Sequence, residues 1–416
     1  MPVLPYGIDS TLSLDLPEST RLEHCAAPRG KSDDVLRQSV QQVLAEPLEY
    51  PPLAQVALPG DRVVLALARE VPQASLIVAQ TIEALLAGGT EAGNIAVVCE
   101  SSEVDEDALL AELAPEVRQA VSVQAHDPEL REGLSYLAAD AEARPIYINR
   151  TLYDAEVVIP IGVLRLTDAL AYAGIHSSVF PAFSDAESLE RFRAPKAARE
   201  GEQGRLRKQA DEVGWLLGTQ FTIQVVPAAA GGVLHVLAGL PEAVLREGSR
   251  RCEQAWSFGV PERAALVVAT VVGDAAQQTW ENVGRALASA ARVLEDDGSV
   301  IVCTQLDRPI GPAMARLMDA DDLHAAERRI VRERSSDALA ARELVLALNR
   351  AKVYLLSRLD DDLVERLGML PVDAAGAARL AGRATSCIVL SSAQYAVAHP
   401  ESEAALGSGS GGSSHR

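Results

Sequence analysis

Short runs of consecutive apolar residues recur along the first half of this chain, each followed by a segment with helical spacing. Before the first run the chain is rich in proline and is predicted to be irregular apart from one helix at 32–44. After it, Val78, Ile82 and Leu85 fall on one face of a predicted helix that a pair of glycines ends. Strands that are apolar throughout are buried on both faces, as in parallel sheets with helices on either side. We therefore predict a mostly parallel sheet with strands at 62–68, 94–99, 121–124, 146–149 and 157–161.

The second half of the chain repeats this alternation and predicts a second unit of the same kind. Its strands are expected at 265–270, 299–303, 353–356 and 386–390. A helix with Trp280, Val283 and Leu287 on one stripe follows the first of these strands, and three helices are expected between 312 and 349. The two halves are joined by a predicted hairpin and a helix that ends near residue 256.

This pattern, with a length of 416 residues, predicts an α/β protein of two domains, with mostly parallel sheets and flanking helices. The first domain is expected to comprise residues 1–260 together with 386–400, because the last apolar strand is expected to return to it. The second is expected to comprise residues 261–385. Residues 407–416, GSGSGGSSHR, are expected to form a disordered tail.

Charge and cysteine content narrow the classes of function. The chain has 58 acidic and 38 basic residues, and a net charge of −20 argues against binding to nucleic acid or to anionic membranes. Its five cysteines are scattered without a CxxC pair, which favours a reducing compartment. The amino terminus lacks a secretion signal, and no uncharged apolar run reaches ~18 residues, so a cytoplasmic protein is expected.

The polar groups most typical of an active site gather in the segment that follows the strand at 157–161. It holds Arg165, Asp168, His176, Ser177 and Ser178 before the next predicted helix, and it contains no lysine. Reactive side chains are often found where a strand ends and a helix begins. His176 is the candidate catalytic base with Asp168 as an acid or orienting group, and a loop histidine satisfied by backbone groups is the alternative.

Familiar signatures of other sites are missing from the sequence. It has no GxxxxGK[ST], no GxGxxG after a strand, no GxSxG and no HExxH, and its histidines and cysteines do not have the spacing of a metal site. No metal ligand is therefore predicted. Arg69 and Arg165 are candidates for binding a substrate carboxylate, and Ser177 and Ser178 are candidates for further contacts with it.

Several segments follow one another in an order that resembles one enzyme family over nearly the whole chain. They begin with LPYG at 4–7 and continue with RPIYINRTLYDAEVVIPIG at 144–162 and AGIHSSVFPAF at 173–183. The hairpin with its helix and the run VGDAAQQTWENVGR from residue 272 follow. In this order the chain resembles the nickel-dependent lactate racemases, the LarA-like family.

The resemblance implies a two-domain α/β protein with its active site in the cleft between the domains. In that family a nickel-pincer nucleotide is tethered through a lysine of the Ala-Gly loop and accepts hydride from the 2-carbon of a hydroxy acid. Histidines remove and return the hydroxyl proton. Gln277 and Trp280 lie in the segment that matches the second-domain Gln-Asn-aromatic helix, which makes them candidates for binding substrate.

The sequence departs from the family pattern where the chemistry lies. Of the family's Asp-His-Thr-Arg-Pro, residues 68–72 keep only the proline, and Glu100-Ser101-Ser102 replaces a Gly-x-His. The tethering Gly-Gly-Arg-Lys is shortened to residues 175–178, so the lysine is missing. A second-domain lysine that contacts substrate falls near Gly284, and Asp168 is the nearest counterpart of a lost histidine.

Three hypotheses follow. In the first, the protein is lactate racemase-like with a degraded nickel-pincer site, does not racemise lactate, and acts as a binding or regulatory protein with a ligand in the cleft, for which a small carboxylate is the candidate. In the second, it is an enzyme of altered chemistry that uses His176 as base. In the third, it is a working 2-hydroxyacid racemase or epimerase that holds the nickel-pincer nucleotide without a covalent tether.

Overall fold

Two six-stranded sheets, one in each half of the molecule, organise the chain in a computed structural model that describes residues 2–101, 103–166, 174–198, 200–318 and 322–402. The first sheet has the strand order β11-β10-β9-β4-β5-β6, and only the hairpin β10–β11 is antiparallel. Its strands are β4 (Val63–Leu67), β5 (Ile95–Cys99), β6 (Ser122–Ala125), β9 (Val157–Val163), β10 (Thr222–Pro227) and β11 (Val233–Gly239).

Helices cover both faces of the first sheet, as its uninterrupted apolar strands require. Leu36, Val40 and Leu44 of α1 and the apolar side chains of α2 form one core with this sheet. Phe192 of α6 and Leu206 of α7 belong to the core on the other face. The helices of this half are α1 (Asp33–Ala45), α2 (Ala74–Ala87), α3 (Glu106–Leu109), α4 (Pro115–Ala120), α5 (Arg150–Tyr153), α6 (Ala186–Arg193), α7 (Glu200–Leu216) and α8 (Pro241–Trp256).

The second sheet is parallel throughout and has the order β16-β15-β14-β13-β17-β3. Its strands are β3 (Arg21–Cys25), β13 (Ala264–Thr270), β14 (Leu294–Cys303), β15 (Lys352–Leu356), β16 (Leu370–Pro371) and β17 (Ser386–Leu390). One face packs against α9 and α12, and the other against the hairpin β1–β2 and α14. The remaining elements of this half are β1 (Val3–Tyr6), β2 (Ser10–Ser13), α9 (Trp280–Val293), α10 (Pro312–Met318), α11 (Leu323–Ile330), α12 (Ala338–Leu348), α13 (Asp361–Arg366) and α14 (Ala374–Ala381).

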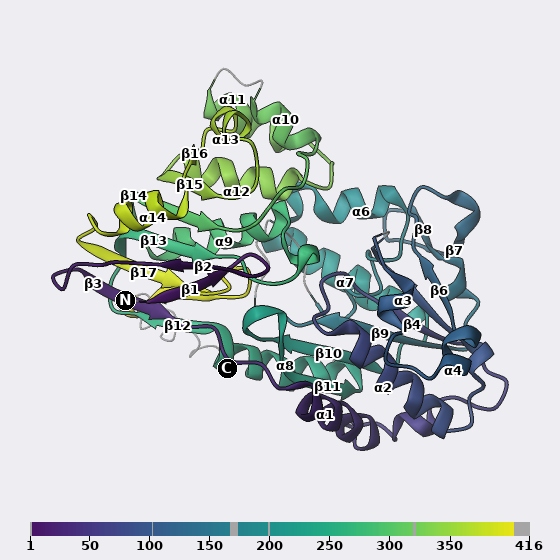
Figure 1. Cartoon of the computed structure of the whole chain (residues 1–416). Coiled ribbons are helices and arrows are strands. Elements are labelled where there is room, and N and C mark those ends of the chain that lie inside the picture. The colour runs from purple at the N-terminus through teal and green to yellow at the C-terminus, as the bar shows by residue number, and fades with distance from the viewer. Residues whose placement is uncertain (1, 102, 167–173, 199, 319–321, 403–416) are drawn as a thin grey trace, which may run out of the picture.

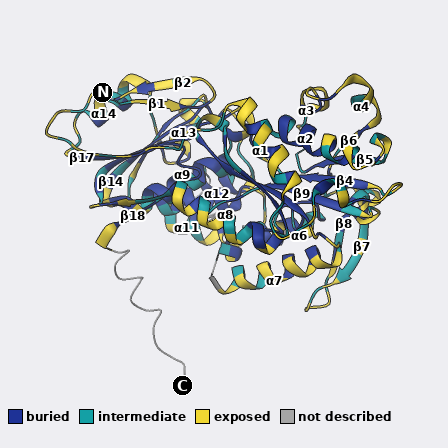
Figure 2. Ribbon diagram, turned by 90° about the horizontal axis from the view of Figure 1, so that it is seen from below, coloured by how far each residue is buried: buried dark blue, intermediate teal, exposed yellow. Residues whose placement is uncertain are grey.

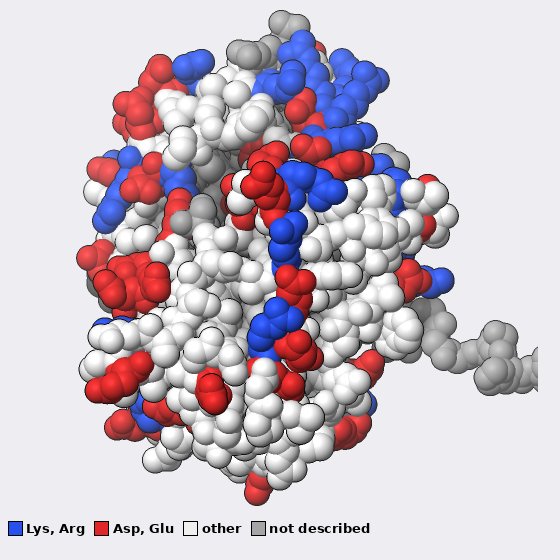
Figure 3. Space-filling model, turned by 90° about the vertical axis from the view of Figure 1, so that its right-hand side faces the viewer, with Lys and Arg blue, Asp and Glu red and all other residues white. Residues whose placement is uncertain are grey.

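Figure 1 shows these two halves side by side, with the first strands of the chain lying against its last ones in the left-hand half. In Figure 2 the strands of both sheets are buried, and the exposed residues lie mainly on the outer sides of the helices and on the loops. On the face shown in Figure 3, acidic side chains are spread widely and basic side chains gather toward the top. None of the helices in the described part of the chain combines the length and apolar composition of a membrane span.

Each sheet has a point at which the strand order reverses, and this point is where α/β proteins commonly bind ligands. In the first sheet the chain runs from β4 outward through β5 to β6 and then returns to place β9 on the other side of β4. In the second sheet β14 and β15 extend one side of β13, and β17 lies on its other side. The loops after β4 and β9 therefore diverge, as do those after β13 and β17.

Two predictions about the domains are wrong. Strand β17 lies beside β13 in the second sheet and does not return to the first, although residues 386–390 are a strand as predicted. The amino-terminal segment is not irregular, because β1 and β2 pair with each other and β3 pairs with β17. Residues 397–400 form β18 (Val397–Pro400), which pairs with β12 (Ser257–Val260) outside both large sheets. An apolar strand fits either sheet in composition, so its pattern does not name its neighbour.

One smaller prediction also differs from the structure. The predicted strand at 146–149 is β8 (Pro145–Asn149), but it pairs only with β7 (Leu134–Ala139) in a separate antiparallel hairpin. The hairpin between β10 and β11 is confirmed, as are three helices between residues 312 and 349 in the described part of the chain. The tail at 407–416 lies outside the described residues.

Candidate active site cleft

A cleft of ≈ 510 Å³ lies between the two halves, at the carboxyl ends of the central strands of the first sheet. Its volume falls in the range of pockets that hold small ligands, roughly 300–1,000 Å³. One wall comes from the loops after β4, β5 and β9 and from α6, and the other from the start of α9 and the segment before it. Four of the predicted site residues line it: Arg69, Arg165, Ser177 and Ser178.

Glu100 joins two arginines on the first wall. Arg69 follows β4 and Glu100 follows the neighbouring β5, so the parallel strands bring them together. The backbone N–H and Nε of Arg69 donate to the two carboxylate oxygens at 2.9 Å each, and an Nη of Arg193 donates to the second at 3.3 Å. Burial by itself would raise the pKa of Glu100, but Arg69 and Arg193 outweigh it and hold that pKa below its ordinary value. Burial and the neighbouring Arg69 lower the pKa of Arg193 to about 10.

Glu70 joins two other arginines that line the cleft. Its carboxylate accepts from Arg165 at 2.5 Å and from Arg285 of α9 at 3.4 Å, so one glutamate links the two halves. Arg165 is 8% exposed and Glu70 is 17% exposed. Glu70 has a φ of 63°, in the left-handed region that costs a residue with a side chain of order 1–3 kcal/mol. Surrounding contacts must therefore hold its backbone.

Those contacts come from the loops of the second half. Gln277, which follows β13, donates to the backbone oxygen of Glu70 at 3.1 Å and accepts from the hydroxyl of Tyr395 at 3.0 Å. Arg165 donates to the backbone oxygen of Gln394 at 3.1 Å, and its guanidinium lies 4.7 Å from the centre of the Tyr395 ring. The loops at the two points of strand reversal are thus in contact with each other, and the cleft lies next to this contact.

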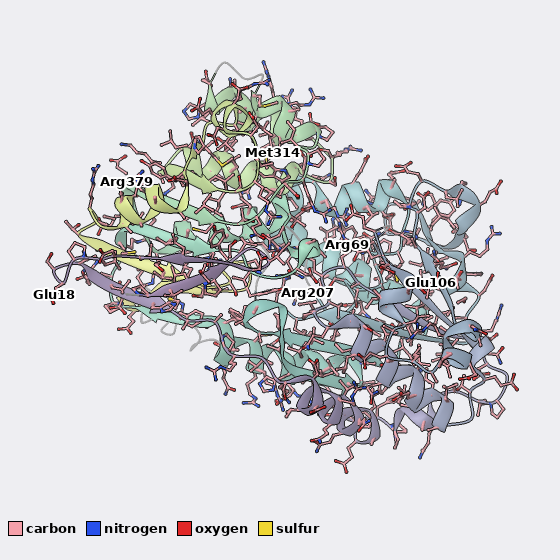
Figure 4. All side chains as sticks on the ribbon, in the orientation of Figure 1. Glu18, Arg69, Glu106, Arg207, Met314 and Arg379 are labelled. Atoms are coloured by element: carbon pink, nitrogen blue, oxygen red, sulfur yellow. The ribbon has the colours of Figure 1, made fainter. Side chains whose placement is uncertain are left out.

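Arg69 is the predicted arginine that remains most open to the cleft. In Figure 4 it lies at the junction between the two halves. Its side chain is 42% exposed, although it is paired with Glu100. Arg165, by contrast, is committed to Glu70, Gln394 and Tyr395, so its visible role is to join the two halves.

Ser177 and Ser178 lie on the cleft wall in a turn that their own hydroxyls stabilise. Ser177 donates to the backbone oxygen of Gly174 at 2.6 Å and Ser178 to that of Ile175 at 3.4 Å. Gln224 of β10 in turn donates to the Ser178 hydroxyl at 3.4 Å. The serines therefore shape the wall, and their lone pairs are the groups they offer to a ligand.

His176 is not among the described residues that line the cleft. It is 9% exposed, and its ring packs against α7 at Gly214, where a Cβ would come within 2.4 Å of Nδ1. Burial lowers the pKa of His176, and the nearby carboxylates of Asp211 and Glu242 oppose this. The imidazole therefore packs against α7 beneath the loop, and its role as a catalytic base stays a prediction.

The three other predicted site residues are also not among the described residues that line the cleft. Asp168 lies outside the described residues. Gln277 does not line the cleft but joins the halves, as described above. Trp280 is 5% exposed in the core of the second half, and its Nε1 has no hydrogen-bond partner in the described part of the chain. The family resemblance at residues 277–280 therefore identified a segment next to the cleft, although Gln277 and Trp280 themselves do not line it.

The sequence interpretation missed most of the charged residues of the cleft. Glu100 was noted only as a departure from a family motif, although its place after β5, next to Arg69 after β4, was a usable signal. Arg193 ends a helix far along the chain, and nothing local marks it. The remaining charged residues that line the cleft are Glu70, Glu103, Glu281, Arg285 and Arg308.

The nickel-pincer nucleotide implied by the family resemblance does not fit the donors that the cleft offers. The described residues that line it include neither lysine nor histidine, and residues 167–173, TDALAYA, contain neither. Lys196, in the short turn after α6, is exposed and does not line the cleft. Across the described residues, no group of three or more His, Cys, Asp or Glu side chains could hold a metal ion.

Comparison with known proteins places this geometry in context. The family model for the lactate racemase N-terminal domain matches residues 6–197. The lactate racemase apoprotein from Thermoanaerobacterium thermosaccharolyticum has a similar structure, with a TM-score of 0.75 and 16% identity over 95% of this chain and 99% of that one. A protein from Thermotoga maritima is similar with a TM-score of 0.66 and 12% identity, over 89% of this chain and 98% of that one. At such identities the likeness shows the fold. No curated protein matches the sequence.

Glu70 is expected to hold the two halves together. Glu70→Gln leaves Arg165 and Arg285 without this shared charge in a mostly buried place, and we expect it to lower the free energy of unfolding by about 3 kcal/mol. Arg308→Gln is the matched control, because its pair with Glu103 also crosses the cleft but is exposed, and it should cost about 1 kcal/mol or less. Urea denaturation of both variants measures the difference. Equal losses would show that Glu70 does not have this role.

The buried, neutral state of His176 predicts a pH dependence. Because the folded-state pKa is lowered, the unfolded chain takes up a proton first as pH falls through the ordinary value of about 6.5, and stability is lost there. His176→Asn removes this contribution, so the stability gap between wild type and variant should shrink as pH falls from about 7 to about 5. His324→Asn, at an exposed position of α11, is the control. A gap for His176→Asn that is constant or widens toward low pH would contradict this assignment.

Proposed function

We propose that the chain is a lactate racemase-like (LarA-like) protein that binds a small carboxylate in the cleft without a lysine-tethered nickel cofactor. The observation that supports the proposal most is the composition of the cleft. Arginine–glutamate pairs line it where the family has histidines and a tethering lysine. This proposal is the first of the three hypotheses that the sequence allows.

Arg69 and Arg193 are the groups we assign to the carboxylate. Both line the cleft from the first half, and they share the single carboxylate of Glu100. A guanidinium has five N–H donors, so each arginine keeps donors for a ligand beyond those it gives to Glu100. Glu100 in turn fixes the direction of both side chains, which lowers the entropy that the arginines lose when a carboxylate binds.

A binding role accounts for the position of His176 as well. A general base must come within hydrogen-bond reach of the proton that it removes. His176 packs against α7, away from the lining of the cleft, and burial lowers its pKa. We therefore assign to this loop the task of shaping the pocket through Ser177 and Ser178 and assign no proton transfer to it.

Carboxylate binding is tested by thermal stability in the presence of a panel of 2-hydroxy, 2-oxo and 2-amino acids. A ligand that binds only the folded state raises the melting temperature with its concentration. We expect at least one acid to do so for wild type, and Arg69→Gln and Arg193→Gln to lose the shift. Arg62→Gln, which removes an exposed arginine outside the cleft, should retain it. A panel without any stabilising acid would refute the proposal.

The cofactor part of the proposal is tested by metal and mass analysis. Protein purified from cells that make the nickel-pincer nucleotide should contain no stoichiometric nickel, and its intact mass should equal that of the unmodified chain. A lactate racemase produced in the same cells is the control. It should contain nickel, and its intact mass should be increased by the tethered cofactor. Stoichiometric nickel in this protein would instead favour the hypothesis of a cofactor held without a tether.

A further inference from the structure

Glu281 is a carboxylate in the cleft that the contacts described so far do not use. It lies in the first turn of α9, lines the cleft from the second half, and is partly buried. Within the described part of the chain it makes no hydrogen bond or ion pair, whereas Glu70, Glu100 and Glu103 each pair with at least one arginine. An acidic residue in the first turn of a helix also interacts favourably with the positive end of the helix dipole. That contribution explains its place on the helix but leaves its oxygens free to accept from a ligand.

Glu281 lies close enough to Arg69 and Arg193 to act on both. The pKa of Arg69 is raised chiefly by Glu100 and to a lesser extent by Glu281. For Arg193, burial and Arg69 lower the pKa, and Glu100 and Glu281 work in the opposite direction. Glu70 also raises the pKa of Arg69, and Arg285 also lowers that of Arg193, so the electrostatic group holds three positive and three negative charges. Glu100 contacts Arg69 and Arg193 directly, and Glu281 approaches from the other wall.

This balance of charge favours one kind of carboxylate over another. A 2-hydroxy acid would bring one uncompensated negative charge next to two glutamates. A 2-amino acid is neutral overall, and its ammonium group can donate to Glu281 while its carboxylate accepts from the arginines. A hydroxyl and an ammonium group can both donate to a carboxylate, but only the ammonium adds a charge of opposite sign, and the attraction between the two charges favours it. The unpaired carboxylate thus suits an ammonium better than a hydroxyl.

The rest of the cleft wall is apolar on the side of α6. Leu189 and Phe192 are three residues apart on this helix and line the cleft together with Arg193, and Val163 at the end of β9 lies on the same wall. A ligand whose carboxylate lies on Arg193 would have its side chain against this surface. An apolar side chain gains from leaving water there, at about 25 cal/mol per Å² of buried apolar area.

We propose that the ligand of the cleft is a 2-amino acid with an apolar side chain, bound as a zwitterion between the two arginines and Glu281. The carboxylate accepts from Arg69 and Arg193, and the ammonium group donates to Glu281. This assignment rests on the proposed function, because it specifies which carboxylate the cleft takes. It makes Glu281 the residue that distinguishes an amino acid from a hydroxy acid.

Calorimetric titration with isosteric pairs tests the proposal. The probes are L-leucine against L-leucic acid, its 2-hydroxy analogue, and L-phenylalanine against L-phenyllactic acid. We expect one amino acid to bind at least about tenfold more tightly than its hydroxy analogue, since tenfold corresponds to one added charged hydrogen bond. In Glu281→Gln, which keeps the size of the side chain, this preference should fall to about twofold or less. Glu295→Gln, at an exposed position on β14, is the matched control and should keep it.

The outcomes separate this inference from the proposed function. Hydroxy acids that bind as well as or better than their amino analogues would overturn the assignment of Glu281 and leave carboxylate binding in place. A preference that survives Glu281→Gln would overturn the role of Glu281. Failure of all four probes would overturn the amino-acid assignment, and the wider panel of acids then decides whether carboxylate binding fails with it. Circular dichroism and the melting temperature of Glu281→Gln establish that the variant is folded.

Discussion

The rest of this structure depends on one contact between the two halves, where the loops after β4 and β9 touch the loops after β13 and β17. Glu70 leaves β4 in a left-handed backbone conformation and is held by Arg165 from its own half and by Arg285 and Gln277 from the other. Charged side chains that are mostly buried are stable only when they are paired and hydrogen-bonded. The contact therefore fixes where the two sheets lie relative to each other, and the cleft is the space that remains beside it.

The same principle explains why the cleft is so polar and yet so well defined. Each of Glu70 and Glu100 accepts from two arginines, so the carboxylates orient the guanidinium groups before any ligand arrives. A site organised in this way suits the recognition of a carboxylate, because little rearrangement is needed when the ligand binds. Glu281 differs from the other glutamates because it lies in this field without a direct partner in the described part of the chain, and for this reason we assign the selectivity of the cleft to it.

Likeness in fold does not by itself imply likeness in chemistry. The family model matches residues 6–197, and the similar solved structures cover 95% and 89% of the chain. Both sheets are built from apolar strands, which tolerate many substitutions as long as they stay apolar. Groups at the strand ends carry the chemistry and are not required for the fold. A change from histidine and lysine to glutamate and arginine at these ends can therefore alter the function while both sheets persist.

The sequence by itself determined most of the longer helices and strands and the approximate place of the candidate site. Uninterrupted apolar runs such as β4, β5 and β17 were recognisable because burial on both faces requires them, and the loop after β9 was recognisable because polar groups gather there. Only the tertiary structure decided which sheet received β17 and β3, because an apolar strand can pair in either. It also decided that His176 packs beneath the loop and that Arg193 and Glu281 face the cleft. Those placements depend on contacts between residues far apart in the chain, and no local spacing records them.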